Sequence, residues 1–138
     1  MAKAKKTLAK SSFVDKNIEV ALEKLAVASA AVDNAVAVRA RDAKKLAVLV
    51  KRLTKRKTSL SKRKRLAAAR LKKSPSVDTR KALRVVTKDL ATTIKEQAKA
   101  KAAKAANSTE LAALRAGQKR ATGYRKGIAA VDRALAKK

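Results

Sequence analysis

The chain has neither cysteine nor histidine among its 138 residues. The absence of thiols excludes disulfides and thiolate metal sites. The absence of histidine removes the commonest metal ligand and the commonest general base. The ten acidic residues are spread out, mostly early in predicted helices where capping accounts for them, and no glycine-rich phosphate loop or nucleophile motif is present. We therefore expect no catalytic site, no metal, no cofactor and no small-molecule substrate, and we predict that the protein is not an enzyme.

Glycine, proline and aromatic residues are also scarce, with three Gly, one Pro, one Phe, one Tyr and no Trp. Alanine supplies 32 residues, about half of the hydrophobic set, and each alanine buries little area. A thick globular core is therefore not expected. Ala, Lys, Arg and Leu are strong helix formers, so the composition predicts an all-α protein.

Long apolar runs are missing too. No uninterrupted stretch approaches the roughly 20 apolar residues that a membrane-spanning helix needs. An amphipathic helix lying on an anionic membrane remains a third hypothesis. Its apolar faces are narrow and poor in aromatics, so we expect membrane insertion to be weak and do not expect a membrane partner.

The pattern along the chain predicts a basic flexible arm over residues 1–11 and one elongated helical domain over 12–138. A long helix is expected over 12–73, where about 1.5 Å per residue gives a length approaching 90 Å. Apolar residues from Ile18 to Leu60 recur mostly in steps of three and four, which is typical of a coiled-coil seam. Arg39 and Lys57 interrupt this predicted seam.

Pro75 marks a turn over residues 74–76, because the residue before a proline avoids helical geometry. Ser76 or Asp78 then caps a second helix over 77–106. The motif "NSTE" after Ala106 predicts a third helix over 108–136. The apolar face of the second helix is expected at Leu83, Val86, Leu90 and Ile94.

The expected fold is thus a long helix followed by one or two return helices, as a helical hairpin or an elongated coiled-coil-like bundle. Pairing of two chains through the Ile18–Leu53 seam, as a homo-oligomer, is the alternative that the sequence leaves open.

Acidic residues are few, and this is the most informative shortage. The chain has 38 basic and 10 acidic residues, a net charge of +28, and no acid between Asp42 and Asp78. The stretch Lys51–Lys73, called the basic segment below, has cations around most of a helix circumference, which suits contact with a wide phosphate surface. Its twelve candidate nucleic-acid-binding residues are Lys51, Arg52, Lys55, Arg56, Lys57, Lys62, Arg63, Lys64, Arg65, Arg70, Lys72 and Lys73.

The Asn, Gln and aromatic residues limit which kind of nucleic-acid contact the sequence predicts. The Asn and Gln residues form no cluster that would aim at base edges, and Phe13 and Tyr124 are the only aromatics available to stack on single strands. Sequence-independent contact with phosphates remains, most simply with double-stranded DNA, although the residues do not separate DNA from RNA. Lys3, Lys5, Lys6 and the Lys95–Lys104 face would assist the basic segment.

In its lysine- and alanine-rich composition the chain resembles nucleoid and linker-histone-like proteins, without sharing a diagnostic motif. We expect an intracellular protein that coats, compacts or bridges nucleic acid, as a nucleoid-associated or virion-internal protein does. The alternative is a helical structural component of a larger assembly, such as a phage particle or ribonucleoprotein, whose charge is neutralised by its neighbours.

Overall fold

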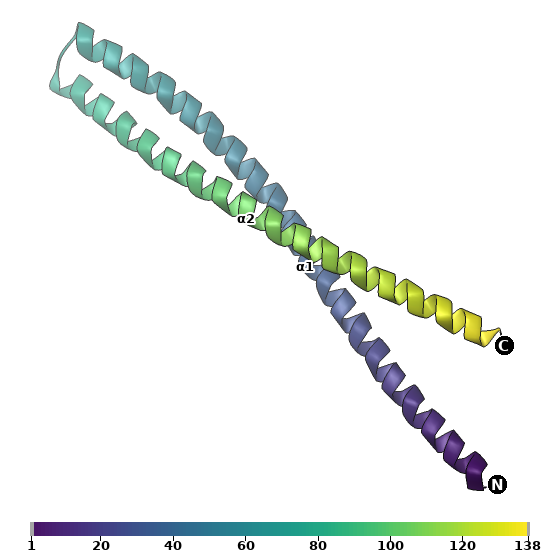
Figure 1. Cartoon of the computed structure of the whole chain (residues 1–138). Helices are drawn as coiled ribbons and strands as arrows, with labels where there is room; N and C mark the ends of the chain where they lie inside the picture. The colour runs from purple at the N-terminus through teal and green to yellow at the C-terminus, as the bar shows by residue number, and fades with distance from the viewer. Residues whose placement is uncertain (1, 138) are drawn as a thin grey trace. The chain divides into compact units, whose positions relative to one another are not determined.

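The computed structural model describes the backbone of residues 2–137 and the side chains of residues 15–137. Helix α1 spans Ala2–Lys73 and helix α2 spans Val77–Ala136, with residues 74–76 between them (Figure 1). No strand occurs over residues 2–137. The all-α prediction is confirmed, and the two helices pack against each other as a helical hairpin. The predicted basic arm of residues 1–11 lies outside the residues whose side chains are described.

The turn forms where the sequence places it. α1 ends at Lys73, and Pro75 stands in the connection. The Ser76 hydroxyl accepts a hydrogen bond from the Thr79 backbone N–H at 3.2 Å, and the Thr79 hydroxyl accepts one from the Ser76 N–H at 2.9 Å. This reciprocal pair is a capping box with threonine in the place of the usual glutamate. Ser76 is therefore the cap, and Asp78 contributes a favourable charge in the first turn.

The prediction of separate helices over 77–106 and 108–136 is wrong, because α2 continues through Asn107 without a break. Asn107 is 4% exposed, and its side chain bonds to α1 instead of capping a new helix. The three glycines that follow also lie inside α2. Each weakens a helix by up to about 1 kcal/mol relative to alanine, which is not enough to end a helix held by packing.

From Leu22 to Leu60 the predicted spacing of the seam in α1 is confirmed, whereas Ile18, where the seam was expected to begin, is exposed. The two expected interruptions are not found. Arg39 and Lys57 are half-buried and continue the seam, since long side chains can cover apolar surface with their methylene groups while the charge stays in water. Buried and half-buried positions in steps of three and four are Leu22, Leu25, Ser29, Val32, Val36, Arg39, Ala43, Leu46, Val50, Leu53, Lys57 and Leu60.

The matching face of α2 is more polar than the sequence analysis expects. Thr93 is 1% exposed, whereas Ile94, which was expected on this face, is 44% exposed. Steps of three and four, with one step of seven between Ala100 and Asn107, place the covered positions of α2 at Leu83, Val86, Leu90, Thr93, Gln97, Ala100, Asn107, Leu111 and Leu114. The seam therefore buries small and polar side chains among a few leucines, and the core is thin.

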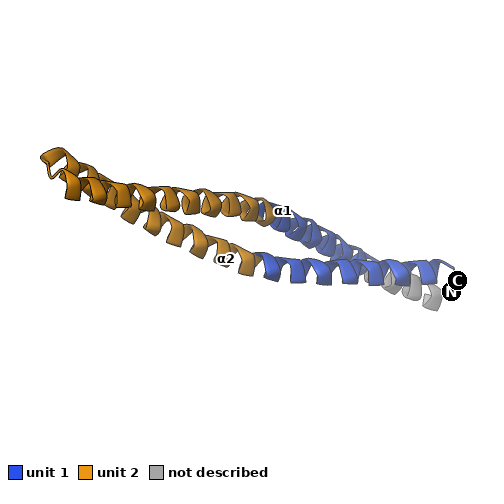
Figure 2. Cartoon of the chain, turned by 90° about the horizontal axis from the view of Figure 1, so that it is seen from above, with its two compact units in different colours: residues 1–38, 111–138 blue, residues 39–110 orange. Residues whose placement is uncertain are grey.

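Contacts divide the chain into two compact units (Figure 2). Unit 1 comprises residues 1–38 and 111–138, and unit 2 comprises residues 39–110 with the turn. Leu53, Leu60 and Ala100 are the buried hydrophobic residues of unit 2, and Leu111 is the buried hydrophobic residue of unit 1 among the described side chains.

Candidate nucleic-acid interface

The basic segment lies in unit 2 as the last 23 residues of α1. Leu53 and Leu60 are buried there, so one side of this helix packs on α2. Eleven of its twelve Lys and Arg residues are exposed, and Lys57 alone is half-buried. The cations therefore occupy the part of the helix circumference that α2 does not cover.

The cations of the basic segment are not matched by ion pairs within the described part of the chain. Among the described side chains, no acidic residue forms an ion pair with any of the twelve cations. Unit 2 as a whole contains 24 basic and five acidic residues, which gives a net charge of +19. Because like charges at this density repel, a neighbouring polyanion would lower the free energy of this unit.

The spacing suits a phosphate backbone. A helix of the length of the basic segment rises about 34 Å, close to one turn of B-DNA. Duplex DNA carries one phosphate charge for roughly every 1.7 Å of its axis, so a contact of this length presents about 20 phosphates to the twelve cations. Unit 2 also exposes Lys95, Lys99, Lys101 and Lys104 on α2, as the sequence analysis expects for the assisting face.

A polar cluster fixes α1 against α2 in the same unit. The Asn107 amide nitrogen donates to the Arg39 backbone carbonyl at 3.0 Å, and the Arg39 guanidinium contacts the Asn107 amide oxygen at 3.4 Å. Arg39 also forms an ion pair with Glu110 at 2.5 Å. Since both ion-pair side chains are more than a third exposed, we assign this pair less than about 1 kcal/mol of stabilisation.

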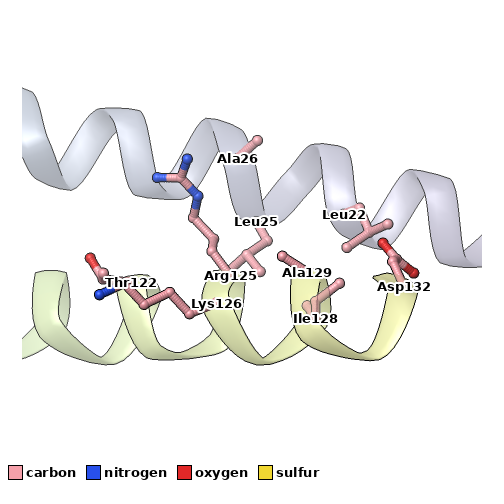
Figure 3. Close-up of a pocket in the computed structure, with 9 residues that line it drawn as sticks. All are labelled: Leu22, Leu25, Ala26, Thr122, Arg125, Lys126, Ile128, Ala129 and Asp132. Carbon is pink, nitrogen blue, oxygen red and sulfur yellow. The ribbon is translucent and has the colours of Figure 1, made fainter. Parts of the chain in front are cut away.

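Further polar contacts bridge the helices in both units. In unit 2 the Gln97 amide donates to the Thr54 hydroxyl at 2.9 Å, and Thr54 donates in turn to the Val50 carbonyl at 2.8 Å. In unit 1 the Arg125 guanidinium reaches from α2 toward α1 (Figure 3) and donates to the Ser29 hydroxyl at 3.1 Å. No described buried side-chain nitrogen or oxygen is left without a partner. The polar seam is therefore fully satisfied.

The polar seam residues of α2, which are Thr93, Gln97 and Asn107, were not predicted from the sequence. Their signal was present, because the steps from Leu90 through Thr93, Gln97 and Ala100 continue the apolar spacing with polar and small side chains. Following the spacing in place of hydrophobicity would have identified them. The basic segment, by contrast, was identified from charge alone.

Comparisons with protein-family models, with curated proteins and with solved structures found no match to the chain. No helix within the described part of the chain is both long enough and apolar enough to cross a membrane. Across the described side chains, acidic residues do not gather into a group of three that would hold a metal ion.

Proposed function

We propose that the protein binds nucleic acid without sequence preference, through contacts between phosphates and the basic segment of α1. Double-stranded DNA is the first ligand to test, and the expected consequence of binding is that the protein coats, compacts or bridges strands. The observation that carries this proposal is the set of eleven exposed cations that no described acidic side chain pairs with.

The positions of the Asn and Gln side chains, which would be needed for base-specific recognition, support the same proposal. Of the five Asn and Gln residues, Gln97, Asn107 and Gln118 form hydrogen bonds with residues of α1. Base-specific recognition needs such amides aimed at groove edges on a defined module. Asn17 and Asn34 are exposed but lie in unit 1, away in sequence from the basic segment. Binding through phosphates needs none of these groups.

A titration of duplex DNA at several salt concentrations tests the proposal. If half of the twelve cations contact phosphates at once, the logarithm of the binding constant should fall with the logarithm of salt concentration with a slope of about −5. Two duplexes of unrelated sequence should bind equally well. A structured RNA and a single strand in parallel would rank the nucleic-acid classes.

Two matched variants locate the contact. Arg63→Gln, Lys64→Gln and Arg65→Gln together remove three charges from the basic segment. Arg115→Gln, Lys119→Gln and Arg120→Gln together remove three exposed charges from unit 1, so this variant has the same net charge as the first variant. If all three of these cations contact phosphates, the first variant should reduce the magnitude of the salt slope by about 2 to 3, because each lost phosphate contact removes roughly 0.9. The second should change the slope by less than about 1.

A shallow salt dependence, a clear preference for one sequence, or equal losses in the two variants would each contradict the proposal. Failure to bind duplex DNA at moderate salt would favour the alternative function, that of a helical component of an assembly whose neighbouring proteins neutralise the charge. In that case the protein should bind acidic protein surfaces in preference to phosphate polymers.

A further inference from the structure

Unit 1 contains an open apolar groove between the parts of α1 and α2 that belong to it. The groove has a volume of about 690 Å³, and among the residues whose side chains are described Asp132 is the only charged one that lines it. Four of its lining side chains are large, apolar in most of their surface and more than half exposed: Ile18, Tyr124, Val131 and Leu135. Single exposed apolar residues are ordinary, but a contiguous group on one groove marks an interaction surface.

The groove continues an interface that the structure already contains. Leu22 and Leu25 belong to the seam that packs on α2, and they also line the groove together with Ile128. All three are only half-buried. The two helices of one chain therefore leave part of the seam in unit 1 uncovered, and further helices packed here would complete its burial.

Two glycines on the groove are not required by any close contact among the described residues. Gly123 and Gly127 are one helical turn apart in α2, and a Cβ atom built on either meets nothing within 4 Å. Neither has a positive φ angle. Each weakens the helix by up to about 1 kcal/mol relative to alanine, without a steric reason inside the hairpin. Small residues four apart allow the backbone of another helix to approach closely, which gives the pair a function if a helix docks there.

The charges beside the groove indicate which helix docks there. Asp15, Glu19 and Glu23 are exposed and spaced by four, so they form an acidic stripe along α1 beside the groove residues Ile18 and Leu22. No described basic side chain pairs with this stripe, and like charges at this spacing repel one another within a helix. Residues 121–137, which include the end of α2, carry the opposite excess, since Arg125, Lys126, Arg133 and Lys137 outnumber Asp132.

We infer that the groove is a docking surface for a second copy of this chain, in a two-fold symmetric pair. The acidic stripe of each copy would face the basic part of α2 in the other, which makes one surface self-complementary, as an isologous contact requires. Unit 1 is also the unit with less self-repulsion, with a net charge of +9 from 14 basic and five acidic residues against +19 for unit 2. The inference does not depend on nucleic-acid binding.

The oligomeric state of the full, nucleic-acid-free chain tests this inference. At about 0.5 M salt the Debye length is roughly 4 Å, so long-range repulsion between copies is screened. Sedimentation across protein concentrations should show dimers. Gly127→Leu fills the groove while it favours the helix, so it should weaken dimerisation at least about tenfold without loss of helix content.

Gly117→Leu is the matched control, because Gly117 lies in α2 but does not line the groove. It should dimerise like the unchanged chain. Reversal of the stripe by Asp15→Lys, Glu19→Lys and Glu23→Lys should weaken dimerisation at least about tenfold, because it removes the complementary charge. Since the chain has no cysteine, a spin label on Ala130→Cys, at an exposed position of α2 that does not line the groove, would report the distance between the two copies, which should be single-valued in a symmetric dimer.

Four results would overturn the inference. They are a chain that stays monomeric at every concentration, equal dimerisation of the Gly127 and Gly117 variants, open-ended filaments in place of dimers, and a monomer that carries a bound lipid or other apolar molecule in native mass spectrometry. None of these results bears on the duplex titration, so the two proposals fail separately.

Discussion

The side-chain amide of Asn107 in α2 donates a hydrogen bond to the backbone carbonyl of Arg39 in α1, 68 residues away in sequence. The Asn107 amide oxygen also contacts the Arg39 guanidinium, and the side chain of Asn107 is almost completely buried. A buried amide at a seam position selects one alignment of two helices, because any other alignment leaves it without partners. We infer that this pair fixes the register of the hairpin.

Replacement of Asn107 should separate stability from specificity. Asn107→Ala removes the hydrogen bonds and leaves a small gap, so we expect a loss of about 1 to 2 kcal/mol in the free energy of unfolding. Asn107→Leu should retain or increase stability while broadening the distribution of distances between labelled sites on α1 and α2. Denaturant unfolding and spin-label distance measurements check the two parts. Asn34→Ala, at an exposed position, is the control and should change stability by less than about 0.5 kcal/mol.

Two leucines of the basic segment provide a direct test of the hairpin. Leu60 is 6% exposed, whereas Leu66 is 61% exposed. Leu60→Ala should reduce the free energy of unfolding by at least about 2 kcal/mol, because it removes a side chain from the contact with α2. Leu66→Ala should cost less than about 0.5 kcal/mol. Equal effects in thermal unfolding would mean that the basic segment does not pack on α2 in solution.

The cap of α2 gives a third prediction. Ser76→Ala removes the hydroxyl that accepts the Thr79 N–H, so we expect a loss of about 1 kcal/mol. Ser108→Ala, at an exposed site inside α2, should be neutral or slightly stabilising because alanine favours helix. Calorimetric melting of both variants against the unchanged chain is sufficient. If Ser108→Ala proves the more damaging of the two, the assignment of Ser76 as the cap fails.

Ionic conditions should control the folded population. Because unit 2 carries a net charge of +19, self-repulsion destabilises its compact state, and salt screens that repulsion. The melting temperature followed by circular dichroism should therefore rise between about 10 mM and 150 mM salt. The variant that replaces Arg63, Lys64 and Arg65 with glutamine should show a smaller rise. A melting temperature that falls or stays constant over this range would refute the electrostatic explanation.

The turn and the helix content could be predicted because their causes are local. Pro75 disfavours helical geometry at the residue before it, and Ser76 offers a hydroxyl to the first turn of α2. Asn107 is the opposite case. It stands in "NSTE", which fits a helix start, and only the carbonyl of a residue 68 positions away shows that it is a seam residue instead. A polar side chain at a helix start and one at a polar seam look alike until the partner helix is placed.

The candidate interface also has one part that the sequence predicts and one part that depends on how α2 packs. The twelve cations of the basic segment were evident from composition, since no acid occurs near them in sequence. That no acidic side chain of α2 forms an ion pair with them depends on which face α2 presents, and neither segment encodes this alone. The half-burial of Lys57 has the same origin, because it depends on where the seam crosses the basic segment.

The division into units has a consequence for how the chain acquires its structure. Unit 2 is one uninterrupted stretch that closes around the turn, and its Gln97–Thr54 bond joins residues 43 apart. Unit 1 consists of two separate stretches, whose Gln118–Asp33 and Arg125–Ser29 bonds join residues 85 and 96 apart. Since the entropy lost on closing a loop grows with its length, pairing should start beside Pro75 and proceed outward like a zipper. A peptide of residues 39–110 should then fold by itself, whereas the two stretches of unit 1, produced without it, should remain apart.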